Sequence, residues 1–164
     1  ELVQELTENT VTGGVSMINR ALAQLWTGKE EHELLMHDWY LGLLAAAFGN
    51  LVYIDKPGEL YRQHSNNVLG ARTLRKRVKN WVRPHVLFAK YWKLIKDSQT
   101  QARNLLVLPL TAENRELIEN FVTIMEVPFK ERWRRIRQYG YRKNRTFHTL
   151  VFTSLILTKF AYKE

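Results

Sequence analysis

The chain contains no cysteine among its 164 residues. Disulfides, thiolate nucleophiles and Cys-ligated zinc sites are therefore excluded, and the composition fits a reducing compartment. Aspartate is also scarce, because only Asp38, Asp55 and Asp97 occur, and none of them forms an Asp-x-Asp pair. A metal-nucleotide site would thus need acidic residues from outside this sequence.

The motifs of several enzyme classes are also missing. There is no G-x-S-x-G, G-x-x-x-x-G-K-[ST] or G-x-G-x-x-G, so neither a hydrolase nucleophile elbow nor a self-contained phosphate loop is predicted. His32 and His37 stand about 140° apart around a helix, which excludes the H-E-x-x-H motif of zinc proteases. The apolar stretch "TFHTLVFTSLILT" is well short of the ~20 residues of a membrane-spanning helix.

What the chain does have is a very uneven distribution of charge. Residues 1–71 carry four Lys and Arg against nine Asp and Glu, a net charge of −5. Residues 72–164 carry 21 against seven, a net charge of +14, with tryptophan and tyrosine among the charges. The candidate partners of this basic part are nucleic acid, an anionic membrane surface and an acidic neighbouring domain. A solvated helix face is the plain alternative for any single stretch.

Local patterns in the first part predict helices with a few short strands. We expect an extended segment near residues 11–18 and a helix over residues 19–26. The uncharged run after Asp38 predicts a buried helix to Phe48, with Asp38 as its N-cap and Gly49 as its C-cap. "LVYID" and "LYRQH", on either side of "KPGE", predict two short strands joined by a Pro-Gly turn.

The second part is predicted to be helical throughout. Pro84 should break or offset the first long helix, and Thr111 is the expected N-cap of the next one. Pro128 suits the first turn of a third helix.

Three motifs occur in order: "TGGVSMINRAL" at 12–22, "HDWYL" at 37–41 and "YRQHSNN" at 61–67. This ordered set closely resembles the second half of the catalytic domain of family-two inverting glycosyltransferases with the GT-A fold, bacterial rhamnosyltransferases in particular. "PLTAENRELIENF" and the basic residues after it resemble the helical tail of the same group, so the resemblance covers nearly the whole chain. It implies a helix-dominated α+β fold. Residues 1–71 would be the acceptor-side half of a GT-A (Rossmann-like α/β) catalytic domain with a few short strands, and residues 72–164 a helical C-terminal extension.

The resemblance also implies a function. The parent enzyme would transfer a sugar from a nucleotide-sugar donor to a saccharide acceptor during bacterial cell-surface polysaccharide synthesis. The expected sugar is L-rhamnose, and one form of the acceptor is a saccharide linked to a lipid. The nucleotide-binding half does not precede Glu1, so we expect that missing N-terminal half as a partner and no activity from this fragment alone. Exposed faces left without neighbours suggest a homodimer. The expected location is cytoplasmic, at the inner face of the plasma membrane.

In the family, the acid at the position of Asp38 is the candidate general base for the acceptor hydroxyl, a role that is compatible with capping a helix. His37 and Trp39 would contact sugar or acceptor, although Trp39 fits a core aromatic equally well. Gly13 and Gly14 would allow close approach of the backbone to a sugar, or else simply form a turn.

Arg62 and His64 are the residues that the resemblance places at the donor diphosphate. Arg62 would bind phosphate oxygens, and its alternative is a salt bridge to Glu59 or Asp55. His64 would also ligate a divalent metal, Mg or Mn, whose acidic motif would lie upstream of this sequence.

The basic residues before "TFHTLVFTSLILT" favour a helix that lies in the headgroup plane of an anionic membrane. These residues are Arg132, Arg134, Arg135, Arg137, Arg142, Lys143 and Arg145. The apolar residues expected to anchor the helix are Leu150, Phe152, Leu155 and Ile156. The alternative is a helix that packs on its own chain or on another subunit.

Two non-enzymatic functions remain open from sequence alone. One is a basic helical module that binds nucleic acid, although the resemblance argues against nucleic acid as a partner. The other is a scaffold whose basic tail recruits a partner at the membrane.

Overall fold

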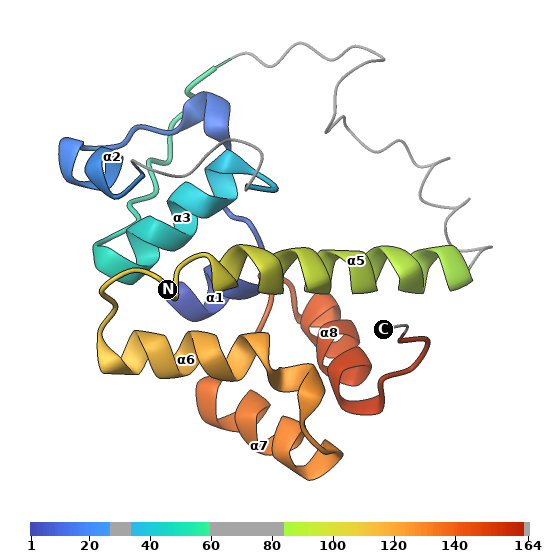
Figure 1. Cartoon of the computed structure of the whole chain (residues 1–164). Helices are drawn as coiled ribbons and strands as arrows, with labels where there is room; N and C mark the ends of the chain where they lie inside the picture. The colour runs from blue at the N-terminus through green and yellow to red at the C-terminus, as the bar shows by residue number, and fades with distance from the viewer. Residues whose placement is uncertain (27–33, 60–83, 163–164) are drawn as a thin grey trace.

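The computed structural model describes residues 1–26, 34–59 and 84–162. Within these residues the secondary structure is entirely helical (Figure 1). The α-helices are α1 (Leu2–Thr7), α2 (Arg20–Trp26), α3 (His37–Phe48), α5 (Pro84–Arg103), α6 (Ala112–Val122), α7 (Phe129–Tyr139) and α8 (Thr146–Thr158), with short 3-10 helices η1 (Gly13–Val15) and η3 (Ile124–Glu126).

The expectation of an α+β fold containing a GT-A half is therefore wrong, because the described ranges contain no strand. "LVYID" lacks regular structure, and the side chains of Val52, Tyr53 and Ile54 are 78%, 86% and 63% exposed. Branched and aromatic residues favour extended backbone, but a strand also needs a neighbour to complete its hydrogen bonds. The predicted extended segment at residues 11–18 instead contains η1. The second predicted strand, "LYRQH", lies outside the described residues.

The helix α3 confirms the predicted buried helix, but its N-cap lies two residues earlier than expected. Met36 is its N-cap, and Asp38 lies within the first turn. Gly49 is the C-cap, as predicted, and its N–H donates to the carbonyl of Ala45 at 3.0 Å.

The predicted ends of the later helices are close to those observed. The hydroxyl of Thr111 accepts the Asn114 N–H at 3.2 Å and so caps α6 as predicted. Pro128 is the N-cap of α7 and not a residue of its first turn. Pro84 is the first residue of α5, where its missing N–H removes no intrahelical hydrogen bond.

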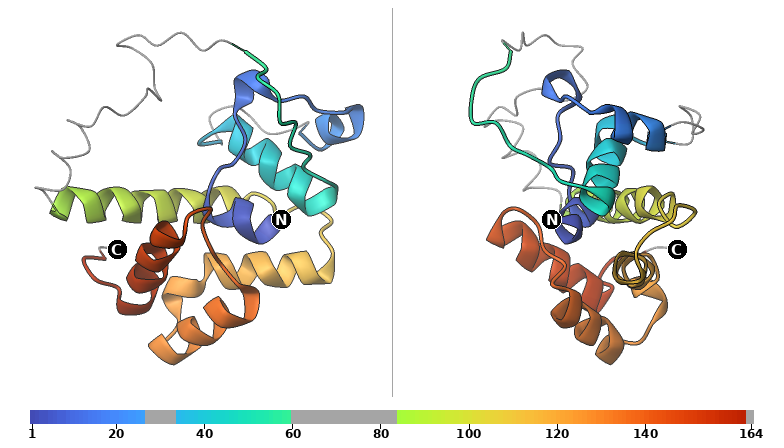
Figure 2. Two further views of the ribbon diagram at one scale, coloured as in Figure 1. Left: turned by 180° about the vertical axis from the view of Figure 1, so that it is seen from behind. Right: turned by 90° about the vertical axis from the view of Figure 1, so that its left-hand side faces the viewer.

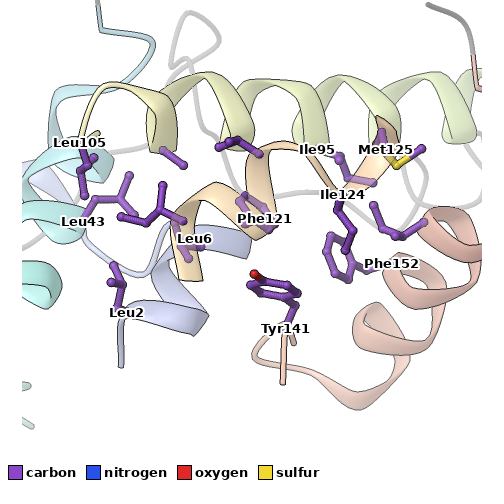
Figure 3. Packing of buried hydrophobic residues seen from close by; sticks show 14 of the residues in the cluster. Leu2, Leu6, Leu43, Ile95, Leu105, Phe121, Ile124, Met125, Tyr141 and Phe152 are labelled. Atoms are coloured by element: carbon purple, nitrogen blue, oxygen red, sulfur yellow. The ribbon is translucent and has the colours of Figure 1, made fainter. Parts of the chain in front are cut away.

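One hydrophobic core is shared by residues from both predicted parts of the chain. The long helix α5 runs across the molecule, with α1 and α3 near its C-terminal half and α6, α7 and α8 on the side shown lower in Figure 1 (Figures 1 and 2). Leu6, Leu43 and Leu105 fill one end of the core in Figure 3, and Ile95 and Phe152 fill the other. The predicted boundary between residues 71 and 72 lies outside the described residues.

The helix α8 packs on its own chain. Phe152, Leu155 and Ile156 are only 0%, 3% and 0% exposed, whereas Leu150 is 65% exposed. Three of the four proposed membrane anchors therefore belong to the core, which corrects their assignment. Across residues 1–26, 34–59 and 84–162, none of the helices combines the length and apolarity that crossing a bilayer requires.

Arg132, expected among the lipid-facing cations, is also buried. Its Nη1 donates to the carbonyl of Val127 at 2.6 Å, and its Nη2 donates to that of Leu157 at 2.9 Å. Leu157 lies in the last turn of α8, where carbonyls lack an intrahelical donor. Arg132 thus connects the turn before α7 to the C-terminal end of α8.

The first residues of the chain are tied to the segment between α7 and α8. Arg142 Nη2 donates to Glu1 Oε2 at 2.6 Å, and the Asn144 N–H donates to Glu8 Oε2 at 2.9 Å. Lys143 donates to the carbonyl of Thr7, and burial lowers the pKa of its ammonium. These contacts join segments that are far apart in the sequence.

The helices α7 and α8 both end at a residue with positive φ, but only one of these residues is glycine. Gly140 has φ 68°, and Lys159 has φ 54°. Side chains are strained in this region, so we expect Lys159→Gly to raise the free energy of unfolding by about 0.5–1 kcal/mol. Urea unfolding would measure the change, with Gly140→Ala as a control that should shift stability the opposite way. A loss of stability in Lys159→Gly would contradict the prediction and show that the contact of Lys159 with Tyr162 outweighs the strain.

Candidate functional site

The carboxylate of Asp38 receives three hydrogen bonds at the N-terminal end of α3. The side-chain amide of Asn9 donates to Oδ1 at 3.2 Å, and the Trp39 N–H donates to the same oxygen at 2.8 Å. The N–H of Gly13 donates to Oδ2 at 3.3 Å from 25 residues away in the sequence. These donors and the positive end of the helix dipole stabilise a half-buried anion. The prediction that Asp38 is the N-cap is therefore wrong, and its carboxylate acts from inside the first turn instead.

Asn9 is a member of this cluster that sequence reasoning missed. Its Oδ1 accepts the Val11 N–H at 2.9 Å, which leaves its NH₂ group to donate to Asp38. This local turn is typical of asparagine. The only sequence signal is an asparagine in a polar lead, which does not distinguish a positioning residue from an ordinary turn.

Gly13 and Gly14 are each approached closely by a side chain from elsewhere in the chain. A Cβ atom on Gly13 would lie 2.8 Å from Nε2 of His37, and one on Gly14 would lie 3.1 Å from Oε1 of Glu59. The structure thus brings together the predicted residues Gly13, Gly14 and His37 beside Asp38. It adds Glu59, which the sequence suggested only as an ion-pair partner.

Trp39 is a core residue. Its side chain is 4% exposed, and its Nε1–H donates to the carbonyl of Glu5 at 2.7 Å. The ring therefore presents no open face to a sugar, which corrects its assignment as a binding residue in favour of the core-aromatic alternative.

An open pocket of about 740 Å³ adjoins His37. Its lining is mostly apolar and includes Ile18, Trp26, Met36 and Leu41. His37 is exposed, and Asp38 follows it directly in α3. The pocket thus meets the cluster through His37, and Asp38 is not among the residues that line it.

Arg62 and His64 lie outside the described residues, so their predicted donor and metal contacts stay predictions. The described ranges contain no group of three His, Cys, Asp or Glu side chains that could hold a metal. Within these ranges there is thus no ligand set for Mg or Mn, and we derive no step through a metal.

Glu5 anchors the loop that carries Asn9 and Gly13. Its side chain is 3% exposed, and its Oε2 accepts the Thr10 N–H at 3.4 Å. Its Oε1 accepts a hydrogen bond from the Thr10 hydroxyl. Burial raises the pKa of Glu5 above its usual value, and the hydrogen bonds from Thr10 oppose part of that rise.

This shift predicts how stability depends on pH. Because the folded-state pKa of Glu5 is raised, the folded protein holds this proton more tightly, and stability present below pH ~4.3 is lost as the pH rises through the folded-state pKa. We expect Glu5→Gln to remove this loss, so the difference in free energy of unfolding between the variant and the wild type should grow in favour of the variant from acid to neutral pH. Urea unfolding at a series of pH values from acid to neutral would test this, with Glu113→Gln, at an exposed position, as the control. Equal pH slopes in wild type and Glu5→Gln would contradict the prediction.

The cluster is thus a held carboxylate beside an exposed imidazole and an open, mostly apolar pocket. Chemically, the carboxylate of Asp38 can accept a proton from a hydroxyl group that is brought next to it. No family model, curated protein or solved structure matches the chain.

Proposed function

We propose that the chain activates the acceptor in an inverting glycosyl transfer, with Asp38 as the general base. The observation that carries the proposal is the carboxylate of Asp38, which is held on both oxygens by Asn9, Gly13 and Trp39. Such fixed donors orient a carboxylate and leave its remaining lone pairs to accept a proton. The ordered motifs around Gly13, Asp38 and Arg62 supply the reaction class.

In this reaction the acceptor oxygen attacks the anomeric carbon of the donor sugar. A carbon–oxygen bond forms as the bond from that carbon to the diphosphate breaks, and the nucleoside diphosphate leaves with the electron pair. Asp38 takes the proton of the attacking hydroxyl, and the anomeric configuration is inverted. His37, exposed beside the pocket, is placed to orient an acceptor hydroxyl.

The proposed donor is nucleotide-activated L-rhamnose, and the proposed acceptor is a saccharide of a bacterial cell-surface polysaccharide, carried on a lipid. Arg62 and His64 are proposed to bind the donor diphosphate. The reaction would take place at the inner face of the plasma membrane, where soluble nucleotide sugars and lipid-linked acceptors meet.

The contacts of the arginines on α7 argue against the alternative that the basic helices bind nucleic acid. On α7, Arg134 and Arg135 both bind Glu131, with N···O distances of 2.6 and 3.0 Å. Hydrogen bonds from these two arginines lower the pKa of Glu131 to about 2. Since Arg132 is buried as well, much of the positive charge on this helix is already engaged within the chain.

The test is a transfer assay with the protein at the full length that its gene encodes. It is incubated with activated L-rhamnose or other nucleotide sugars, with and without saccharide acceptors. We expect release of nucleoside diphosphate that depends on the acceptor, and NMR of the product should show an inverted anomeric centre. An acceptor lacking the attacking hydroxyl should give no such release. Absence of acceptor-dependent release with every donor, or a product of retained configuration, would overturn the proposal.

A further inference from the structure

Three large apolar side chains stand exposed along and just beyond α8. Phe147 and Leu150 are 64% and 65% exposed and lie about one helical turn apart, and Phe160 is 59% exposed. We call these three residues the α8 crest. Exposed apolar groups gathered in one place mark interaction sites more often than singly scattered ones do.

The crest is held in place by the structure beneath it. Nε1 of the buried Trp92 donates to the carbonyl of Phe160 at 2.8 Å, and the ring of Phe88 meets that of Phe160 edge-on at 5.1 Å. A groove of about 500 Å³ runs beside the crest, lined by Phe88, Leu150, Val151 and Phe160 among others. Phe160 is therefore fixed in an outward position although it adjoins the core.

The segment of chain that carries the crest has charge of only one sign, although Glu8 lies against Asn144, next to Arg145. The helix α8 itself carries no charged side chain, and Arg145 and Lys159 stand at its two ends as N-cap and C-cap. Residues 132–162 contain no Asp or Glu. Lys96 and Lys159 approach the ring of Tyr162 at 5.0 and 5.8 Å, close in sequence to Phe160. The apolar helix α8 is thus flanked by a cation at each end.

We propose that the α8 crest docks on an anionic lipid surface, with α8 lying in the plane of the headgroups. Arg145 and Lys159 would meet lipid phosphates, while Phe147, Leu150 and Phe160 enter the acyl boundary. A second copy of the chain fits this surface less well, because its own cations would face those of the first. The helix spans roughly 20 Å, which is enough for both ends to reach headgroups at once.

This inference deepens the membrane location given under Proposed function, but it rests on α8 and not on Asp38. It also differs from the sequence-based expectation. The residues that meet lipid are the exposed Phe147, Leu150 and Phe160, and the buried Phe152, Leu155 and Ile156 remain in the core.

The experiment is co-sedimentation of the full-length protein with vesicles of phosphatidylcholine, alone or mixed with phosphatidylglycerol. We expect the wild type to bind the mixed vesicles only. The double variant Phe147→Ser/Leu150→Ser should lose about tenfold or more in partition coefficient, because two exposed apolar groups no longer enter the lipid. Arg145→Glu should also weaken binding, and added salt should weaken it further.

The matched control is Met17→Ser/Val107→Ser, which removes two side chains that are 91% and 73% exposed and lie outside the crest. It should bind vesicles as the wild type does, and urea unfolding should show that both double variants remain folded. Three results would overturn the proposal: no binding of the wild type to mixed vesicles, equal binding by the crest variant, or lipid-free self-association that the crest variant abolishes. Vesicle binding without sugar transfer would reject the proposed enzymatic function alone, and transfer without vesicle binding would reject only the docking surface.

Discussion

Asp38→Asn is expected to lower the turnover of sugar transfer by about 10²–10⁴-fold, the range in which general bases contribute. The amide cannot take a proton from the acceptor hydroxyl. Its oxygen can still accept the N–H groups of Trp39 and Asn9, whereas its NH₂ group cannot accept the Gly13 N–H. The fold should therefore persist, with a loss of about 1–2 kcal/mol in the free energy of unfolding.

The measurement is steady-state transfer kinetics with varied acceptor, beside urea unfolding of each variant. Asp97→Asn is the control, because Asp97 makes an exposed ion pair with Lys93 at 2.7 Å on α5 and lies outside the cluster. It should transfer sugar at the wild-type rate. Near-normal turnover by Asp38→Asn would remove Asp38 as the base, and unfolding of this variant would show instead that its role is structural.

Arg132→Met is expected to have the largest effect on stability, a loss of about 2–5 kcal/mol in the free energy of unfolding. Methionine retains an apolar stem but cannot donate to the carbonyls of Val127 and Leu157, which would then be left without this donor. Arg132→Lys should fall in between, because one ammonium cannot reproduce the planar fork of a guanidinium.

Urea unfolding with far-UV circular dichroism would measure these changes. Arg137→Met is a matched control on the same helix, since Arg137 is exposed and its guanidinium lies 5.8 Å from the ring of Trp133. We expect it to cost about 0.5–1 kcal/mol at most. Equal losses in the Arg132 and Arg137 variants would show that the buried hydrogen bonds of Arg132 add nothing to stability.

The helices were predictable where one local pattern decides the structure. The uncharged run before Gly49 indicated α3, and a threonine followed by polar residues indicated the start of α6. "LVYID" misled because its residue types favour extended backbone, whereas pairing depends on distant chain that local composition does not reveal. The same limit applies to α8, whose apolar sequence fits a membrane surface and a protein core equally well.

The candidate site was predictable in its members more than in its contacts. The motifs indicated Gly13, His37 and Asp38, which the structure brings together. Nothing in the local sequence indicated that Asn9 holds Asp38, because that contact depends on how the loop after α1 folds back. The burial of Trp39 likewise follows from α1 packing against α3 and leaving the Glu5 carbonyl within reach.

The ties between the first eight residues and residues 142–144 have a consequence for how the protein is made. Glu1 and Arg142 are 141 residues apart, so α1 leaves the ribosome on the order of ten seconds before the segment that secures it. During that interval Glu5 and the loop holding Asn9 lack their final support. The residues around Asp38 therefore lack their final contacts until Asn144 has left the ribosome. A pause in translation before the codon for Asn144 would prolong the exposure of these residues to chaperones and proteases.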